Sequence, residues 1–423
     1  MKTWSIFILV LIFSFPGQNV FSQEETSILK GLVIDRKSDK LMLIRGSQDP
    51  FHEGIEIPII DGLFEYFLDV PFLEKYQLVF FGEVTDGSFR PIDFFPDAPV
   101  VAFELYPKQD FKRNKITGGA LNAEMLAFDK AMHEEVFYEY EKYELAIDEL
   151  RESGRFFSAE AMALFDQLNE TGEREKLQEL YARIDSLQND QDAFYTTEGA
   201  ELVRQGEAMA ESMINFQAAY YDNNNSLFAY SLLFLHYQFY EQFKENLDLD
   251  KMKLAYFTFL EHFPDHPYTI EIGNRLNAME QIVAGGHYID FATETMDGEP
   301  VQVSGIMNGK VVLLDFWASW CGPCRAKSKK VIPLFEKYHD LGFQVIGIAR
   351  EYKSTSAMET AIKTDGYPWT YFVELDSKYN LWARYNINAA GAHFLLDENG
   401  IILAIDPDIG EVEMILKERL GGE

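Results

Sequence analysis

The spacing of apolar residues changes twice along this chain of 423 residues, and each spacing is typical of a different kind of structure. From about Thr26 to Glu104, short runs of branched and aromatic residues alternate with turn signals, which favours a small β-sandwich or barrel. From about Leu121 to Gln281 the apolar residues recur at helical intervals. After residue 284, strands and helices alternate, which predicts an α/β fold with a mixed sheet flanked by helices.

These changes divide the chain into four predicted segments. Lys2 and the apolar run from Trp4 to Phe15, followed by small residues near Ser22, predict a signal peptide at residues 1–22. The run is shorter than the roughly 20 residues that a membrane span needs, so we expect a mature protein that is not inserted in the membrane, with an uncleaved anchor as the alternative. The other segments are a β-rich domain at 23–117, a helical region at 118–284 and an α/β domain at 285–423.

Two glycine-containing turns predict how strands connect. Asp61-Gly62 separates the apolar runs Ile55–Ile60 and Leu63–Leu68, which is a strong signal for a two-residue β-hairpin. Near the C-terminus, Glu398-Asn399-Gly400 stands between two further apolar runs and predicts an antiparallel hairpin there.

The charge balance excludes some classes of partner. The chain has 69 acidic and 37 basic residues and a formal net charge of −32. Nucleic-acid binding requires clustered Lys and Arg, so this balance argues against a nucleic-acid partner. It also argues against a lasting contact with an anionic membrane surface. We interpret the acidity as a contribution to solubility.

The chain has two cysteines, Cys321 and Cys324, separated by only two residues. Exported proteins often use cysteines as structural staples, but a bridge closing so small a loop restrains little of the unfolded chain. The alternative is half of a zinc site, which needs two further Cys or His ligands at suitable spacing. No other cysteine exists, and His339 and His393 are isolated in the sequence. We therefore predict a redox-active pair with no metal and no separate cofactor.

The position of the pair explains how it would react. The apolar strand Val311–Trp317 precedes it, and a helix is predicted from Ala326 to His339. The free N–H groups and partial positive charge at a helix N-terminus stabilise a thiolate. Thiols in such positions commonly have a pKa of about 3.5–7.5, whereas a free cysteine has a pKa of about 8.5. We predict that Cys321 is the outer, attacking sulfur and that Cys324, one turn into the helix and more shielded, resolves the mixed disulfide.

Asp315 is the third candidate catalytic residue. It lies inside the apolar strand, where burial of an ionised side chain is costly. A buried carboxylate near Cys324 can accept the proton of that thiol and return it. The alternative is an aspartate at a strand end that faces water.

The segment from Asp315 to Arg325 reads Asp-Phe-Trp-Ala-Ser-Trp-Cys-Gly-Pro-Cys-Arg and resembles the thioredoxin superfamily, with the exported TlpA/ResA-type reductases as the nearest group. The resemblance runs from about Ala284 to the C-terminus and implies a thioredoxin-like fold there. It implies that Cys321 is the nucleophile, Cys324 the resolving thiol and Asp315 a buried acid. Substrate would contact a set of residues around the pair: Trp320, Gly322, Pro323, Ala390 and Gly391.

The same resemblance implies partners and a location. The substrates would be disulfide-containing exported proteins, and a membrane-embedded thiol donor would supply electrons, in the periplasm or cell envelope. The β-rich and helical segments look like the accessory region that precedes many such modules.

One departure from the family concerns the loop beside the active site. The family places a cis-proline where Gly391 stands in the run from Tyr385 to Phe394. A cis bond before a residue other than proline costs about 2.5–4 kcal/mol, so we expect a trans bond or a mobile loop and altered substrate binding.

Three functions remain open. The leading hypothesis is a disulfide reductase, because a Gly-Pro dipeptide between the cysteines accompanies reducing members of the superfamily. A thiol peroxidase of the same fold would carry Thr or Ser three residues before its reactive cysteine, where this chain has Ala318. A partner-binding protein with a degenerate thioredoxin domain is the third, suggested by Gly391.

Overall fold

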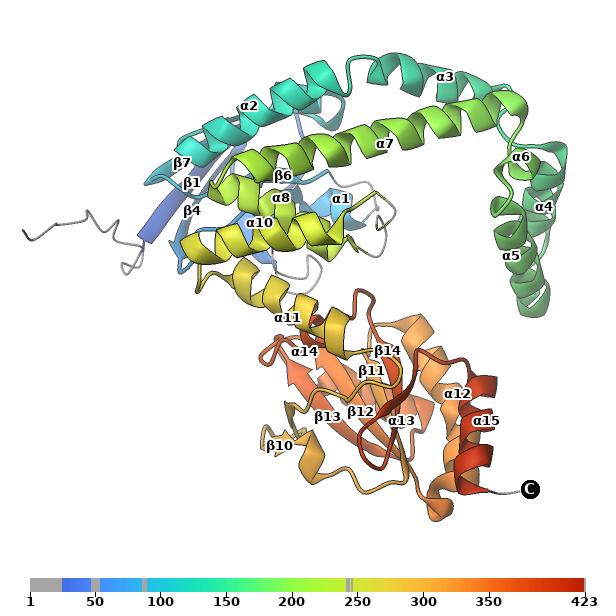
Figure 1. The fold of residues 1–423 in the computed structure, drawn as a ribbon. Coiled ribbons are helices and arrows are strands. Elements are labelled where there is room, and N and C mark those ends of the chain that lie inside the picture. Colours follow the sequence, from blue (N-terminus) through green and yellow to red (C-terminus); the bar gives the residue numbers. More distant parts are fainter. Residues whose placement is uncertain (1–24, 47–53, 86–89, 241–243, 245, 422–423) are drawn as a thin grey trace, which may run out of the picture.

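The computed structural model describes residues 25–46, 54–85, 90–240, 244 and 246–421 (Figure 1). The predicted signal peptide at 1–22 lies outside these ranges. Within them, no helix combines the length and the apolar composition that crossing a membrane requires.

The N-terminal part is a β-sandwich, as the strand pattern predicts. One sheet has the strand order β4-β1-β7-β8 and the other the order β3-β2-β5-β6, and side chains from both form one core. The strands are β1 (Glu25–Val33), β2 (Lys40–Arg45), β3 (Ile55–Pro58), β4 (Leu63–Val70), β5 (Tyr76–Phe80), β6 (Ile92–Phe94), β7 (Val100–Leu105) and β8 (Lys115–Thr117). The short helix α1 (Phe81–Thr85) and a 3-10 turn at Lys108–Arg113 connect them.

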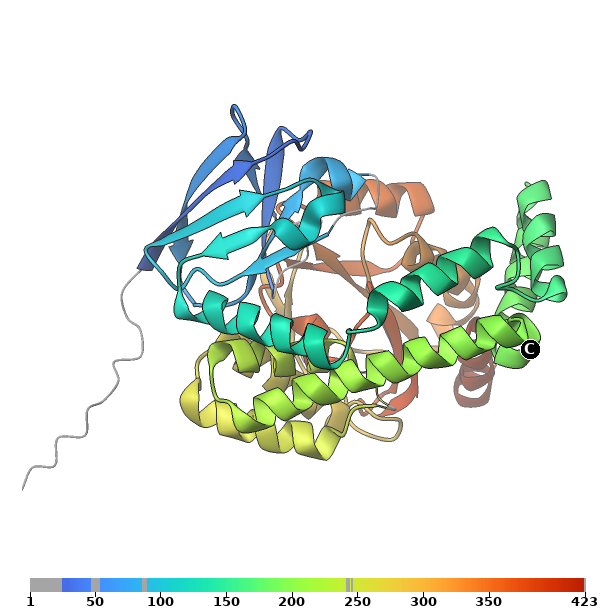
Figure 2. The ribbon, with the colours of Figure 1, turned by 90° about the horizontal axis from the view of Figure 1, so that it is seen from above.

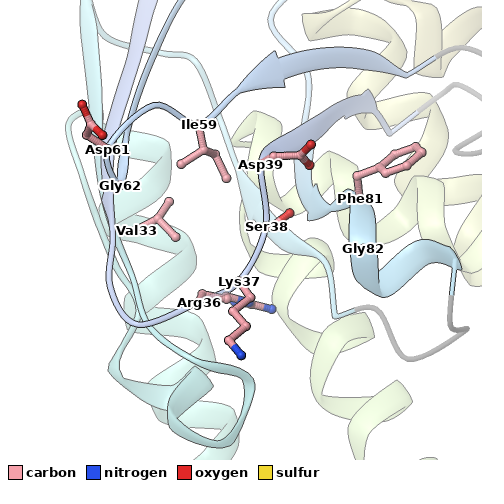
Figure 3. Close-up of a pocket in the computed structure, with 10 residues that line it drawn as sticks. All are labelled: Val33, Arg36, Lys37, Ser38, Asp39, Ile59, Asp61, Gly62, Phe81 and Gly82. Carbon is pink, nitrogen blue, oxygen red and sulfur yellow. The ribbon is translucent and has the colours of Figure 1, made fainter.

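The turn at Asp61-Gly62 forms, but the predicted β-hairpin is wrong. Both residues have positive φ, 52° and 76°, and Ile60 bridges Leu63. However, β3 pairs with β2 whereas β4 pairs with β1, so the two flanking runs enter opposite sheets. Figure 3 shows the turn beside a hollow of about 570 Å³ at this end of the sandwich. Alternating apolar residues fit the inner face of either sheet, which is why the sequence did not distinguish the two pairings.

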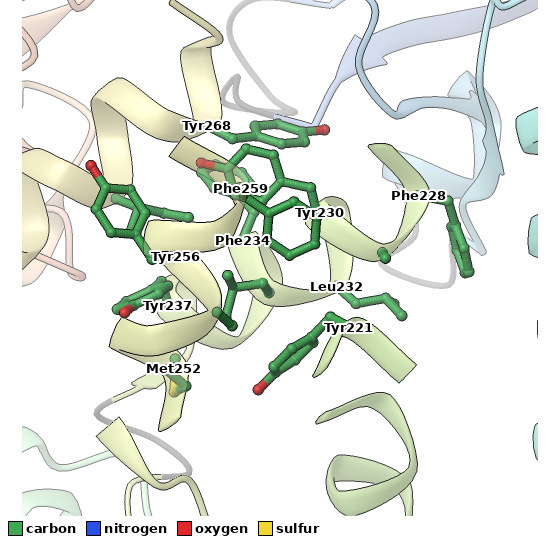
Figure 4. Packing of buried hydrophobic residues seen from close by; sticks show 14 of the residues in the cluster. Tyr221, Phe228, Tyr230, Leu232, Phe234, Tyr237, Met252, Tyr256, Phe259 and Tyr268 are labelled. Carbon is green, nitrogen blue, oxygen red and sulfur yellow. The ribbon is translucent and has the colours of Figure 1, made fainter. Parts of the chain in front are cut away.

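The helical region packs against the sandwich through an aromatic core (Figure 4). Tyr230 stacks on Phe259 with ring centres 4.5 Å apart, and Phe234 stacks on Tyr268 at 4.2 Å. The helices are α2 (Ala120–Glu135), α3 (Tyr140–Glu152), α4 (Ala159–Glu170), α5 (Arg174–Gln188), α6 (Gln191–Phe194), α7 (Thr197–Asn223), α8 (Leu227–Gln238), α10 (Leu249–His262) and α11 (Pro267–Gln281). Helices α3 to α6 and the adjoining end of α7 project as an arm with a small core of its own (Figures 1 and 2).

The C-terminal part is a seven-stranded mixed sheet flanked by helices, which confirms the predicted α/β class. Its strand order is β10-β9-β13-β12-β11-β14-β15; β11, β12 and β13 are parallel, and the other neighbouring pairs are antiparallel. The strands are β9 (Ala292–Glu294), β10 (Pro300–Gln302), β11 (Val311–Trp317), β12 (Phe343–Glu351), β13 (Thr370–Leu375), β14 (Ala392–Asp397) and β15 (Ile402–Ile405). Helices α12 (Gly322–Tyr338), α13 (Ser356–Asp365) and α15 (Ile409–Leu420) cover one face.

Helix α11 connects all three parts. At its start, the ring of His266 bonds the carbonyl of Leu73 at 2.8 Å, and Tyr268 accepts a hydrogen bond from the backbone N–H of Lys75 in the sandwich. Its middle lies in the aromatic core of the helical region. Near its end, Ala278 packs in the core on the second face of the C-terminal sheet, beside α14 (Leu381–Arg384), and Ile282 just after the helix joins it. The domain boundary at residue 284 stays a prediction.

Glu374 makes the stability of the C-terminal sheet depend on pH. Its carboxylate accepts hydrogen bonds from the backbone N–H groups of Tyr379 and Leu381, but burial outweighs these bonds and raises its pKa from 4.5 to about 7. Because the folded chain then binds more protons than the unfolded chain, stability falls as pH rises from about 4.5 to 7. Above about pH 7 the free energy of unfolding is lower by about 3 kcal/mol than it is below about pH 4.5. In urea titrations at several pH values, Glu374→Gln should lack this component, and an unchanged pH dependence would contradict it.

Candidate functional site

Cys321 and Cys324 form a disulfide at the start of α12, directly after β11. Cys321 is the N-cap residue, and its sulfur accepts a hydrogen bond from the backbone N–H of Cys324 at 3.1 Å. The helix begins at Gly322 rather than at the predicted Ala326, because Pro323 suits the first turn of a helix, where its missing N–H costs nothing. The earlier start makes Cys321 the N-cap residue, so its sulfur lies at the helix terminus that carries free N–H groups.

The exposure of the two cysteines differs from the prediction. Cys321 is only 7% exposed, whereas Cys324 is partly buried, so the expectation that Cys324 is the more shielded residue is wrong for the disulfide form. Sequence position along a helix does not report what covers the preceding loop. Trp320, in contrast, is 40% exposed, and Gly322 and Pro323 are exposed as well, so these predicted substrate contacts lie at the surface beside the pair.

Two carboxylates hold the loop around the pair. Glu351, 2% exposed at the end of β12, accepts hydrogen bonds from the backbone N–H and the hydroxyl of Ser319, both at 2.8 Å. Arg325 donates to Asp365 at 2.6 Å, and this bond holds the pKa of Asp365 below its usual range. A second nitrogen of Arg325 donates to the carbonyl of Ser319. The loop from residue 318 to 321 is therefore anchored on both sides, and Glu351 is a site residue that the sequence analysis missed.

Gly391 lies against the disulfide, in the place that the resemblance assigns to a cis-proline. A Cβ atom built on Gly391 would lie 2.2 Å from the carbonyl oxygen of Phe316 and 3.1 Å from the sulfur of Cys324. The described residues contain no cis peptide bond, so this loop has the trans form. The carbonyl of Ala390 accepts a hydrogen bond from the indole N–H of Trp382 at 3.3 Å, and this bond anchors the loop. A glycine is needed here because nothing larger fits between β11 and Cys324.

Asp315 is buried rather than facing water, and it has a partner that the sequence analysis dismissed. It is 2% exposed, and its Oδ1 lies 3.1 Å from Nε2 of His393, which is 3% exposed. The two residues are direct partners in the antiparallel register of β11 and β14. Side chains alternate along β11, so Asp315 points to the same face as Leu313 and Trp317, the face covered by α12 and Cys324.

Comparison with known proteins places this part of the chain in a family. The model described as Redoxin matches residues 284–412, which include the disulfide, Asp315, Gly391 and His393. A thioredoxin-like protein of Bacillus subtilis, YneN, is 32% identical over 115 residues, which is 27% of this chain and 65% of the relative. The sporulation thiol-disulfide oxidoreductase A of the same organism is 30% identical over 118 residues, which is 26% of this chain and 67% of the relative.

The chain belongs to the thioredoxin superfamily of thiol–disulfide oxidoreductases. Among solved structures, the thioredoxin domain of a thiol-disulfide oxidoreductase from Bacteroides vulgatus is similar at 22% identity, covering 32% of this chain and 98% of that chain, with a TM-score of 0.29. The Redoxin match begins at residue 284, so the sandwich and the helical region lie outside it.

A groove of about 630 Å³ adjoins the thioredoxin module on the side of Gly391. Ala389 and Gly391 form one wall, and the other wall comes from outside the family match, with Leu249, Met279 and Ile282. Arg275 of α11 donates to the side chain of Asn388 at the rim, which ties the helical region to the same loop. The helical region therefore helps to line a groove beside the loop of Gly391.

Proposed function

We propose that this chain reduces disulfides of exported proteins through Cys321 and Cys324, with electrons supplied by a membrane-embedded thiol donor. The observation that carries the proposal is the sulfur of Cys321 at the N-terminus of α12, within hydrogen-bonding distance of a backbone N–H. In the reduced protein the same N–H group and the helix dipole favour the thiolate over the thiol. A thiolate, rather than a thiol, is the form that attacks a disulfide.

The reaction proceeds in two exchanges. The thiolate of Cys321 attacks one sulfur of the client disulfide, which forms a mixed disulfide and releases the first client thiolate. Cys324 then loses its proton and attacks the sulfur of Cys321, which releases the second client thiolate and leaves the Cys321–Cys324 disulfide. The client gains two electrons, and the protein gives up two. Because Cys321 is 7% exposed in the oxidised form and the neighbouring Trp320 is 40% exposed, the client sulfur would approach Cys321 from the side of Trp320.

The groove beside Gly391 offers a place for the client chain. Its walls are largely apolar, with Leu249, Met279 and Ile282 opposite the loop at Ala389. Segments around a reducible disulfide that carry apolar side chains would bury them here while the disulfide meets Cys321. The helical region would then act as the second half of a client-binding surface, which gives a reason for the predicted accessory region to adjoin the thioredoxin module.

The redox potential of the Cys321–Cys324 pair tests the direction of the reaction. Equilibration with glutathione or thioredoxin buffers, followed by trapping of free thiols, gives this potential. A reductase should have a value near about −270 mV, whereas a value near about −120 mV would make the protein an oxidant. That second result would overturn the proposed direction while leaving the disulfide chemistry in place.

A further inference from the structure

Asp315, the predicted proton acceptor for Cys324, has a buried partner, His393, that has no role in the chemistry described so far. Both side chains are almost completely buried, at 2% and 3% exposure, and they contact each other at 3.1 Å. Burial of an isolated carboxylate is costly, and a hydrogen-bond donor on the imidazole offsets part of that cost. The two strands β11 and β14 already share a ladder of backbone hydrogen bonds. Burying a carboxylate and an imidazole there costs desolvation free energy that the joining of the strands does not require.

Several observations place this pair beneath Cys324. Asp315 and His393 share the sheet face that α12 covers, and Cys324 is packed against the apolar cluster on that face. A Cβ atom built on Gly391, two residues before His393, would lie 3.1 Å from the sulfur of Cys324. Phe316, the residue after Asp315, supplies the carbonyl that meets Gly391. The start of β14, which carries His393, and the end of β11, which carries Asp315, therefore both lie near Cys324.

Three other ionisable side chains near the pair, those of Tyr367, Tyr371 and Asp406, are poor candidates for this proton transfer. Burial raises the pKa values of Tyr367 and Tyr371, and the negative charge of Asp315 contributes to both shifts. Asp406 accepts a hydrogen bond from the backbone N–H of His393; burial alone would raise its pKa, but this bond and that of Lys327 on α12 hold it low. The tyrosines are therefore neutral, and Asp406 is already bonded. Among these groups, Asp315 is therefore the candidate for proton exchange with Cys324.

We propose that His393 is a positioning residue for the resolving step: its Nε2–H binds Oδ1 of Asp315 and leaves Oδ2 to take the proton of the Cys324 thiol. In this step the S–H bond of Cys324 breaks and an O–H bond forms on Asp315. The Cys324 thiolate then displaces the client thiolate from Cys321. The carboxyl proton finally passes to the released thiolate or to water, which restores the Asp315 anion. The inference rests on the proposed two-exchange function.

A two-phase reaction separates this role from the rest of the chemistry. Reduced protein mixed with dithiobis(nitrobenzoate) releases one coloured thiolate when Cys321 attacks and a second when Cys324 resolves the mixed disulfide. In His393→Leu the carboxylate of Asp315 loses the hydrogen-bond donor that holds it in place. We expect the second phase to slow by about tenfold at neutral pH and its pH profile to move to higher pH, while the first phase is unchanged.

Two further variants make the outcome decisive. His393→Gln keeps an N–H donor at a similar reach and should restore the pH profile, which a merely structural role would not require. In an Asp315→Asn background, His393→Leu should have no additional effect on the second phase, because the two residues act as one unit. An unshifted profile in His393→Leu, or an equal shift in the Asp315→Asn background, would overturn the inference. If the unsubstituted protein showed no first phase, the proposed function itself would be refuted.

Discussion

Replacing Cys321 by serine is expected to reduce disulfide reduction by about a thousandfold or more, because a serine hydroxyl is not ionised near neutral pH and does not attack sulfur. Cys324→Ser should behave differently: the first exchange still occurs, but the mixed disulfide between Cys321 and the client persists. Mass spectrometry of the intact protein after reaction with a disulfide-containing peptide would show an added half-peptide on Cys324→Ser and none on Cys321→Ser.

The reciprocal pair of variants matters here because the observed exposures are the reverse of those predicted. If Cys321→Ser, rather than Cys324→Ser, carried the added half-peptide, Cys324 would be the attacking sulfur. The argument from the helix N-terminus would then be wrong for this protein. Circular dichroism of both variants provides the control for folding, since replacing one sulfur by oxygen changes little volume.

Gly391→Ala is expected to destabilise the protein by about 1–3 kcal/mol, because its Cβ would overlap the carbonyl of Phe316 and press on the sulfur of Cys324. The loop has to move away from β11, so reduction of a peptide disulfide should also slow strongly. Urea unfolding measures the first effect, and the initial rate of peptide reduction measures the second.

Gly305→Ala is a matched control for this substitution. A Cβ atom at Gly305 would have no neighbour within 4 Å, its φ is not in the left-handed region, and it lies outside the candidate site. It should leave stability within about 0.5 kcal/mol of the parent. Equal effects of the two substitutions would show that the close approach at Gly391 does not constrain the loop.

The sequence predicted those features that depend on local pattern. The strand Val311–Trp317, the cysteine pair beside a helix N-terminus and the burial of Asp315 all follow from residues within one short stretch, and the structure has each of them. The thioredoxin resemblance added the position of Gly391 beside the pair.

Features that depend on contacts between distant segments were missed. His393 was considered only as a zinc ligand and set aside as isolated. It is 78 residues from Asp315, and the antiparallel pairing of β11 with β14 places the two opposite each other. A buried aspartate with no local partner was a signal that a distant donor existed. The sequence also did not predict that β3 and β4 join different sheets, or that Cys321 has low exposure. Both features depend on contacts between segments that are far apart in the chain.

Helix α11 has a consequence for how this chain can be divided. A fragment that begins at residue 285, where the strand–helix alternation starts, would lack Ala278 and Ile282, which are 0% and 8% exposed and fill the core against β11 and β14. Cutting there uncovers one side of the sheet and should yield an aggregating product. A fragment that retains Pro267 onward keeps that cover, yet it exposes the aromatic rings with which the first half of α11 meets α8 and α10. Evolutionary gain or loss of the accessory part would therefore require a replacement for one helix, not merely a new linker.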